Sequence, residues 1–167
     1  ILYNLDENRV LYEKDSKEKI AIASMTKIMT AIVAIEHIDN LDETLNLTWA
    51  DFAGLVEANA SVAGFRFGQT VTYRDLLYGL LLPSGADAAQ ALTRTVAGGK
   101  NRFVEMMNEK ATELNLENTH FMNETGLDED GHYSTVEEVA QLFQYALQNE
   151  TFKEIITTSS YTTSDHS

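Results

Sequence analysis

One stretch of the chain, if it forms a helix, is apolar on nearly every side of that helix. It covers residues 28–35 and directly follows the segment Ala23-Ser24-Met25-Thr26-Lys27. Such a pattern is typical of a helix buried in the core rather than of one that lies on the surface. We predict a buried central helix from about residue 24 to residue 36 or 37, with a charged connector over residues 15–19 before it.

Short strands are predicted near the two ends of the chain, with helices between them. Residues 1–5 and 9–13 form a predicted strand pair around a polar turn, and residues 157–163 are polar and β-branched like the beginning of another strand. Capping signals and helical periodicity predict helices over residues 48–57, 72–82, 84–97, 102–114 and 134–147, with a loop over residues 59–69. Met106 and Met107 fall on the predicted buried side of their helix and are interpreted as core residues.

Composition and charge exclude several classes of function. A chain of 167 residues suits one domain with a sizeable core, and its net charge of −14 is unfavourable for binding nucleic acid or an anionic membrane surface. The absence of cysteine excludes disulfides, thiolate metal sites and a cysteine nucleophile. The apolar runs are too short to span a bilayer, and we expect no signal-type segment within residues 1–167. Because the chain begins inside a strand-like pattern, we expect that Ile1 is not the natural start of the protein.

Ser24 and Lys27 are the candidate reactive residues. A spacing of three places them on one face of the predicted helix, and in its first turn the unpaired backbone N–H groups and the helix dipole would stabilise a developing oxyanion. Burial beside a positive helix end would lower the pKa of the lysine, as a general base requires. The pattern predicts a serine nucleophile activated by lysine. The same spacing from Ser16 to Lys19 lies in the charged connector, so the spacing alone is a weak signal.

No other constellation in the sequence predicts a cofactor or a metal site. The four histidines form no His-x-x-x-His pair, and no glycine-rich phosphate-binding loop occurs. His132 could be imagined as the base of a catalytic triad, but no Gly-x-Ser-x-Gly turn accompanies it, so a structural role is favoured. We predict neither a cofactor nor a metal.

Four ordered segments together resemble one family. They are residues 22–31 (IASMTKIMTA), 76–89 (LLYGLLLPSGADAA), 119–127 (THFMNETGL) and 131–135 (GHYST). In this order they are similar to the motifs of serine-type D-alanyl-D-alanine carboxypeptidases, the low-molecular-mass penicillin-binding proteins of the peptidase S11 family. The resemblance covers essentially the whole chain, and the four segments are far more specific together than any one of them is alone.

The resemblance implies an α+β fold of the penicillin-binding-protein and β-lactamase type (transpeptidase-like), with helices packed on an antiparallel sheet. It also implies a carboxypeptidase that removes the terminal D-alanine from peptidoglycan stem peptides and is inhibited covalently by β-lactams. Ser24 would form the acyl-enzyme, Lys27 would accept its proton, and Ser84 would relay a proton towards the leaving D-alanine. The implied substrate-binding positions are Ala23, Gly85 and Ala86. The implied partners are the pentapeptide and β-lactams, at an extracytoplasmic location in a bacterium, with a membrane contact only through an anchor outside this chain.

Two departures from the family pattern matter. The second motif is usually Ser-x-Asn, and Ala86 stands in its third position, where an asparagine amide would hydrogen-bond the substrate. The Lys-Thr-Gly strand, which lines one wall of the site and supplies one oxyanion N–H group, does not occur. We expect residues 1–167 to be the N-terminal part of a serine D,D-peptidase catalytic domain: a strand pair, the central nucleophile helix and a helical lobe. By itself this piece is expected to be partly folded, prone to dimerise and inactive.

Two alternatives remain open beside the carboxypeptidase. A class A β-lactamase needs a deacylating glutamate in a Glu-x-x-x-Asn loop, and that spacing occurs from Glu36 to Asn40, at the tail of the nucleophile helix. The position is wrong for that role. A non-catalytic or weakly active protein that binds penicillin or wall peptides is the second alternative, and Ala86 is the residue that motivates it.

Overall fold

The computed structural model describes residues 15–55, 62–82, 85–125 and 131–158, and it describes residues 15–24 by their backbone. The strand pair predicted over residues 1–13 lies outside this part of the chain. So do the loop from 59 to 61 and the predicted strand from residue 159 onward.

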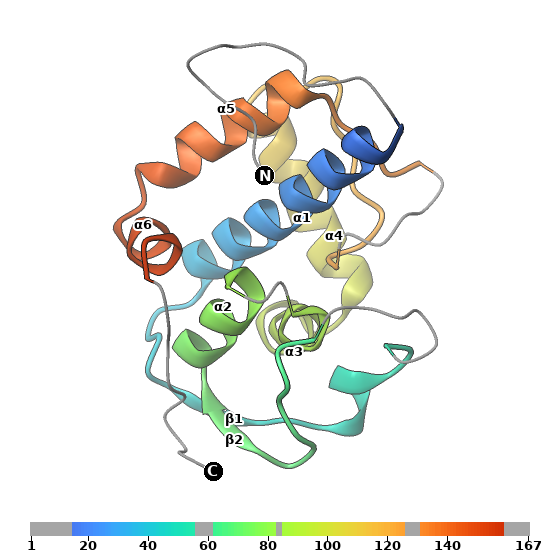
Figure 1. Ribbon diagram of the computed structural model, residues 1–167. Coiled ribbons are helices and arrows are strands. Elements are labelled where there is room, and N and C mark those ends of the chain that lie inside the picture. Colours follow the sequence, from blue (N-terminus) through green and yellow to red (C-terminus); the bar gives the residue numbers. More distant parts are fainter. Residues whose placement is uncertain (1–14, 56–61, 83–84, 126–130, 159–167) are drawn as a thin grey trace.

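The central feature of the fold is the helix α1 (Asp15–His37), which crosses the middle of the molecule (Figure 1). It contacts each of the other five α-helices in the described part of the chain. These are α2 (Tyr73–Leu81), α3 (Ala86–Ala97), α4 (Lys100–Glu113), α5 (Val136–Leu147) and α6 (Glu150–Ile156). A small antiparallel sheet of β1 (Thr44–Asn46) and β2 (Thr70–Thr72) lies beyond α2, and η1 (Trp49–Phe52) is a short 3-10 helix between these strands in the sequence.

The predicted start of the central helix was wrong. Residues 15–19 are not a connector, because α1 already begins at Asp15 and reaches Ser24 in its third turn. The apolar pattern indicates which residues the helix buries but not where the helix begins. Lysine and glutamate are good helix formers, so a charged segment can be the first turn of a helix.

Most of the other helix boundaries follow the capping residues that the sequence shows. Thr72 caps α2: its Oγ1 accepts the Asp75 N–H at 3.0 Å, and the Asp75 carboxylate accepts the Thr72 N–H at 3.0 Å. Thr135 caps α5 in the same position, and Gly98 ends α3 with a φ of 82°, in the left-handed region where glycine is favoured.

One helix boundary, one helix and one strand position differ from the prediction. The helix after Thr48 ends at Phe52 instead of continuing to residue 57. The short helix α6, capped by Asn149, was not predicted, and Thr157 is its C-cap rather than part of a strand. Seven-residue and four-residue helices carry too few turns for their periodicity to be distinguished from that of a strand or loop.

The core forms two hydrophobic clusters that meet at α1. Ala31 and Ile32 face a cluster built with α2, α3 and α6. Met25, Met29 and Val33 face a second cluster built with α4 and α5, which includes the fully buried Met107 and the nearly buried Met106. The interpretation of these methionines as core residues is confirmed.

One ion pair between a buried carboxylate and a half-buried guanidinium ties η1 to α3. The Asp51 carboxylate is 1% exposed and accepts two hydrogen bonds from the Arg94 guanidinium, at 2.8 and 2.9 Å. It also accepts the Thr48 N–H at 2.8 Å, while Arg94 donates to the Asn46 carbonyl at 3.1 Å. A single side chain therefore holds the 3-10 helix and the small sheet against α3.

We predict that Arg94→Ala lowers the free energy of unfolding by about 2–4 kcal/mol, because it leaves the Asp51 carboxylate buried without its cation. The loss of an ordinary surface residue would be expected to change the free energy of unfolding by about 0.5 kcal/mol or less. The matched control is Arg102→Ala, since the Arg102 guanidinium pairs with Glu105 and Glu109 in solvent and its loss should not measurably change stability. Urea unfolding at pH 7 measures both variants, and equal losses would contradict the prediction.

Candidate active site

Among the described residues, Lys27 has the pKa that most clearly indicates a chemical role. Burial lowers the pKa of its ammonium group from 10.5 to about 8, although the Asp87 carboxylate opposes this by attracting the charge. Lys27 lies on α1 and Asp87 in the first turn of α3, so the two motifs that are 60 residues apart in the sequence face one another here. An amine with this pKa is partly unprotonated near neutral pH and can accept a proton.

Ser24 lies three residues before Lys27 on the same helix, a spacing that places two helical positions on one face. The sequence predicted that the helix begins near Ser24, but α1 begins at Asp15. Inside a helix each backbone N–H is bonded to the carbonyl four residues earlier, so the N–H groups around Ser24 are not a cluster of unpaired donors. The pKa of Lys27 is lowered by burial, and the N-terminus of its own helix is not near it. Ala23, the neighbouring candidate for substrate binding, is also within α1.

The second motif begins α3. Ser84 lies outside the described residues, and Gly85 is the N-cap of the helix, with its N–H donating to the Gly79 carbonyl at 2.9 Å. A Cβ at Gly85 would lie 2.7 Å from the backbone nitrogen of Ala63, so this position has no room for a side chain. Ala86 is only 2% exposed. The motif is therefore packed tightly against the loop that contains Ala63.

Asp87 holds that loop in place, a role that the sequence reasoning missed. Its carboxylate accepts hydrogen bonds from the backbone N–H groups of Ala63, Gly64 and Phe65, at 2.8, 3.2 and 3.2 Å. It also accepts the Ala88 N–H at 2.9 Å. In the sequence, an acidic residue at this point indicates only a helix start. Its 2% exposure, which a sequence does not show, is what identifies it as part of the site.

Residues 119–125 and 131–135, from the last two segments of the resemblance and together called the third motif, lie against α1 as well. His120 and Tyr133 form an isolated antiparallel bridge, with N–H to carbonyl distances of 2.9 and 3.0 Å, which closes the segment from 120 to 133 on itself. His132 Nε2 is 2.7 Å from Thr26 Oγ1, and Thr30 Oγ1 donates to the Glu124 carbonyl at 3.0 Å. The other three segments of the resemblance therefore lie against the first one, the stretch of α1 that carries Ser24 and Lys27.

His132 has a structural environment. It is 7% exposed, its Nδ1 accepts the Met122 N–H at 2.9 Å, and its ring packs edge-on against Phe121 at 5.7 Å between centroids. With both ring nitrogens in hydrogen bonds to the protein, the structural role favoured for His132 is supported.

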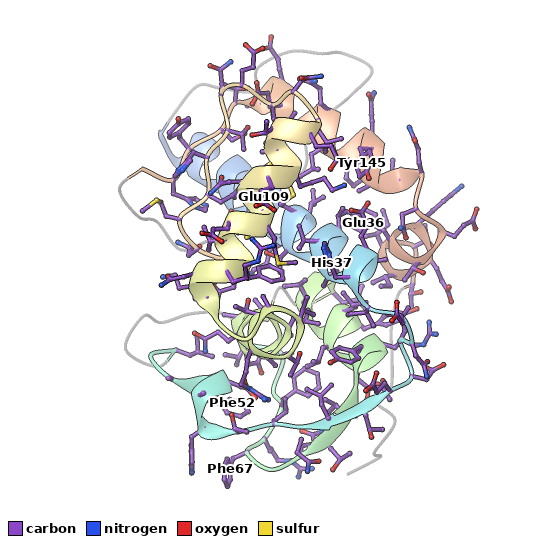
Figure 2. The ribbon with its side chains drawn as sticks, turned by 180° about the vertical axis from the view of Figure 1, so that it is seen from behind. Glu36, His37, Phe52, Phe67, Glu109 and Tyr145 are labelled. Atoms are coloured by element: carbon purple, nitrogen blue, oxygen red, sulfur yellow. The ribbon has the colours of Figure 1, made fainter. Side chains whose placement is uncertain are left out.

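Glu36, the glutamate of the β-lactamase alternative, is held elsewhere. Its carboxylate is 2.7 Å from the Lys110 ammonium of α4 and accepts a hydrogen bond from the Tyr145 hydroxyl of α5, on the side of the molecule shown in Figure 2. Burial alone would lower the pKa of Lys110, but hydrogen bonds with Glu36, Tyr145 and Glu113 raise it well above its ordinary value. Nine residues separate Glu36 from Lys27 on one straight helix, or about 13 Å along its axis. Glu36 is therefore part of a structural ion-pair cluster.

Two further properties concern the described residues as a whole. They contain no group of three or more histidine or acidic side chains that could hold a metal ion. None of their helices combines the length and the apolar character needed to cross a membrane.

The chain is similar to known proteins over most of its length. The family model described as D-alanyl-D-alanine carboxypeptidase, peptidase S11, matches residues 1–166. The chain is 38% identical over 154 residues to D-alanyl-D-alanine carboxypeptidase DacF of Bacillus subtilis, covering 90% of this chain and 39% of that protein. It is 37% identical to a D-alanyl-D-alanine carboxypeptidase of Streptomyces sp. strain K15, covering 91% of this chain and 55% of the relative.

Solved structures agree with the sequence relatives. A mutant of the Streptomyces K15 DD-transpeptidase superposes with a TM-score of 0.79 at 40% identity, over 83% of this chain and 56% of that one. Penicillin-binding protein 6B of Escherichia coli gives a TM-score of 0.78 at 34% identity, over 84% and 46%. The predicted fold is confirmed, and the chain spans about 40–55% of the length of the two curated relatives. This chain belongs to the D-alanyl-D-alanine carboxypeptidase family, peptidase S11.

Proposed function

We propose that the protein carrying this chain removes the terminal D-alanine from peptidoglycan stem peptides through an acyl-enzyme on Ser24, and that β-lactams inhibit it by acylating the same serine. The observation that carries the proposal is the lowered pKa of Lys27, one helical turn from Ser24. Family membership supports the reaction class.

In the proposed reaction the Ser24 hydroxyl attacks the carbonyl carbon of the D-Ala-D-Ala bond while neutral Lys27 takes the hydroxyl proton. The tetrahedral intermediate then collapses, the peptide C–N bond breaks, and Ser84 relays a proton to the leaving amine of D-alanine. Water hydrolyses the ester, which restores the Ser24 hydroxyl and releases the shortened peptide. Gly85, Ala86 and Ala23 are the proposed substrate-binding positions.

The rest of the site is proposed to lie in the remainder of the protein. The relatives are about twice as long as this chain, and the Lys-Thr-Gly strand that characterises the family does not occur within it. We propose that this strand supplies an oxyanion donor and one wall of the pocket, and that residues 1–167 alone are inactive and prone to dimerise. We also propose an extracytoplasmic location in a bacterium, where peptidoglycan is accessible.

A second candidate function rests on Ala86. An alanine side chain cannot make the amide hydrogen bonds of the usual asparagine, and its 2% exposure leaves little contact surface for substrate. The protein could therefore bind penicillin or wall peptides covalently with little or no peptide turnover. Measuring peptide release beside β-lactam labelling distinguishes the two functions.

Ser24 is predicted to be the single site of β-lactam labelling in the complete gene product, with one adduct per chain. Ser24→Ala should abolish the adduct, because it removes the nucleophilic oxygen. Ser16→Ala is the matched control, since Ser16 has the same spacing to a lysine and should label like wild type. Intact-mass analysis and peptide mapping after incubation with penicillin test this, and an adduct on Ser16 or Ser84 would refute the assignment.

Acylation is predicted to accelerate as pH rises, with a midpoint near pH 8. The pKa of Lys27 is lowered to about 8, so below this pH the amine is mostly protonated and cannot accept the Ser24 proton. Lys27→Arg keeps its charge throughout and should slow acylation by at least about 100-fold without the same rise. Stopped-flow measurement with a chromogenic cephalosporin between pH 6 and 10 gives both profiles. A pH-independent rate in the wild type would remove Lys27 from the proposed role.

Ala86→Asn is predicted to raise the turnover of a D-Ala-D-Ala peptide about 5–10-fold, the value of one added hydrogen bond to the substrate. D-Alanine release measures the effect, and the melting temperature of the variant shows whether the buried position accepts the larger side chain. Lower turnover at an unchanged melting temperature would mean that the site is shaped around alanine, and would favour the second candidate function.

A further inference from the structure

Two threonines one turn apart on α1 bind the third motif with their side chains. Thr26 and Thr30 are both 0% exposed, and their hydroxyls reach His132 and the Glu124 carbonyl, respectively. By contrast, Thr93 and Thr95 in α3 donate to carbonyls of their own helix, at 2.8 Å each. The hydroxyls of Thr26 and Thr30 thus join α1 to a separate segment of the chain.

The hydrogen bonds of His132 fix which nitrogen carries the proton. Nδ1 accepts the Met122 N–H, so it has no proton of its own, and in the neutral ring the proton is on Nε2. Nε2 is 2.7 Å from Thr26 Oγ1 and therefore donates to it. Edge-on packing against Phe121 and near-complete burial hold the ring in this orientation.

Thr26 is the residue between Ser24 and Lys27 that faces the third motif. Successive helical residues are rotated by about 100°, so fixing the direction of Thr26 also fixes the directions in which Ser24 and Lys27 project. Thr30 lies one turn further from Ser24, and its bond is to a backbone carbonyl rather than to a side chain. The two bonds have similar burial but differ in their distance from the reacting residues.

We propose that His132 is a positioning residue for acylation, which acts through Thr26 to set the rotation of the turn that carries Ser24 and Lys27. The inference rests on the proposed function of Ser24. Displacement of a reacting group by about 1 Å can cost about 100-fold in rate, so the loss of this bond affects the chemical step more than it affects binding.

The test compares Thr26→Val with Thr30→Val in the complete gene product. Both variants replace a buried hydroxyl by a methyl group of similar size. For each, the non-covalent binding constant and the acylation rate constant for a β-lactam are measured separately, together with the melting temperature. We expect Thr26→Val to lower the acylation rate constant at least about 10-fold with binding changed less than about 3-fold, and Thr30→Val to change both by less than about 3-fold. Thr26→Ser, which keeps the hydroxyl, should restore the rate to within about 3-fold of wild type.

His132→Gln provides a second, independent variant. If His132 acts through Thr26, the double variant Thr26→Val/His132→Gln should be acylated no more slowly than the slower of the two single variants. If the losses of the two single variants multiply in the double variant, the inference is overturned. Equal losses in Thr26→Val and Thr30→Val, or normal acylation of Thr26→Val, would overturn it as well. In each of these cases acylation of the wild type still supports the proposed function. A wild-type protein that is not acylated at all would overturn the proposed function, and this inference with it.

Discussion

The structure depends on the burial of the middle of α1 on nearly every side. The helix contacts five others, and two hydrophobic clusters meet along it, so its residues from Met25 to Ala34 are mostly removed from water. A polar group in such a position must find a partner within the protein or change its protonation, because solvent no longer compensates it. The polar residues of this stretch show both outcomes.

Thr26 and Thr30 illustrate the first outcome and Lys27 the second. The two hydroxyls bind the third motif, which anchors a segment more than 90 residues away in the sequence to the centre of the fold. Lys27 lies between them, and burial makes its charged form less favourable. The packing that builds the core thus also brings the motifs together and prepares the amine for accepting a proton.

Local chemistry predicted the parts of the fold that short segments determine alone. The caps at Thr72 and Thr135 and the glycine after α3 were predicted because side chain and backbone a few residues apart satisfy one another. The start of α1 was not, since helix propensity and solvation do not separate a charged first turn from a connector. The roles of Asp87 and His132 depend on contacts between residues 22 to 106 positions apart, which no local pattern contains.

Two partly buried lysines near carboxylates have opposite pKa shifts, and the difference explains how Asp87 can lie opposite Lys27 without disabling it. The Lys110 ammonium is 2.7 Å from the Glu36 carboxylate, and this hydrogen bond, with those of Tyr145 and Glu113, outweighs burial and keeps the amine charged. Asp87 instead directs its oxygens at four backbone N–H groups, and its effect on Lys27 is a Coulomb attraction that burial exceeds. Hydrogen bonds from N–H groups stabilise the anion and spread its charge over the loop and the start of α3. Asp87 therefore fixes the geometry of the second motif while leaving Lys27 able to lose its proton near neutral pH.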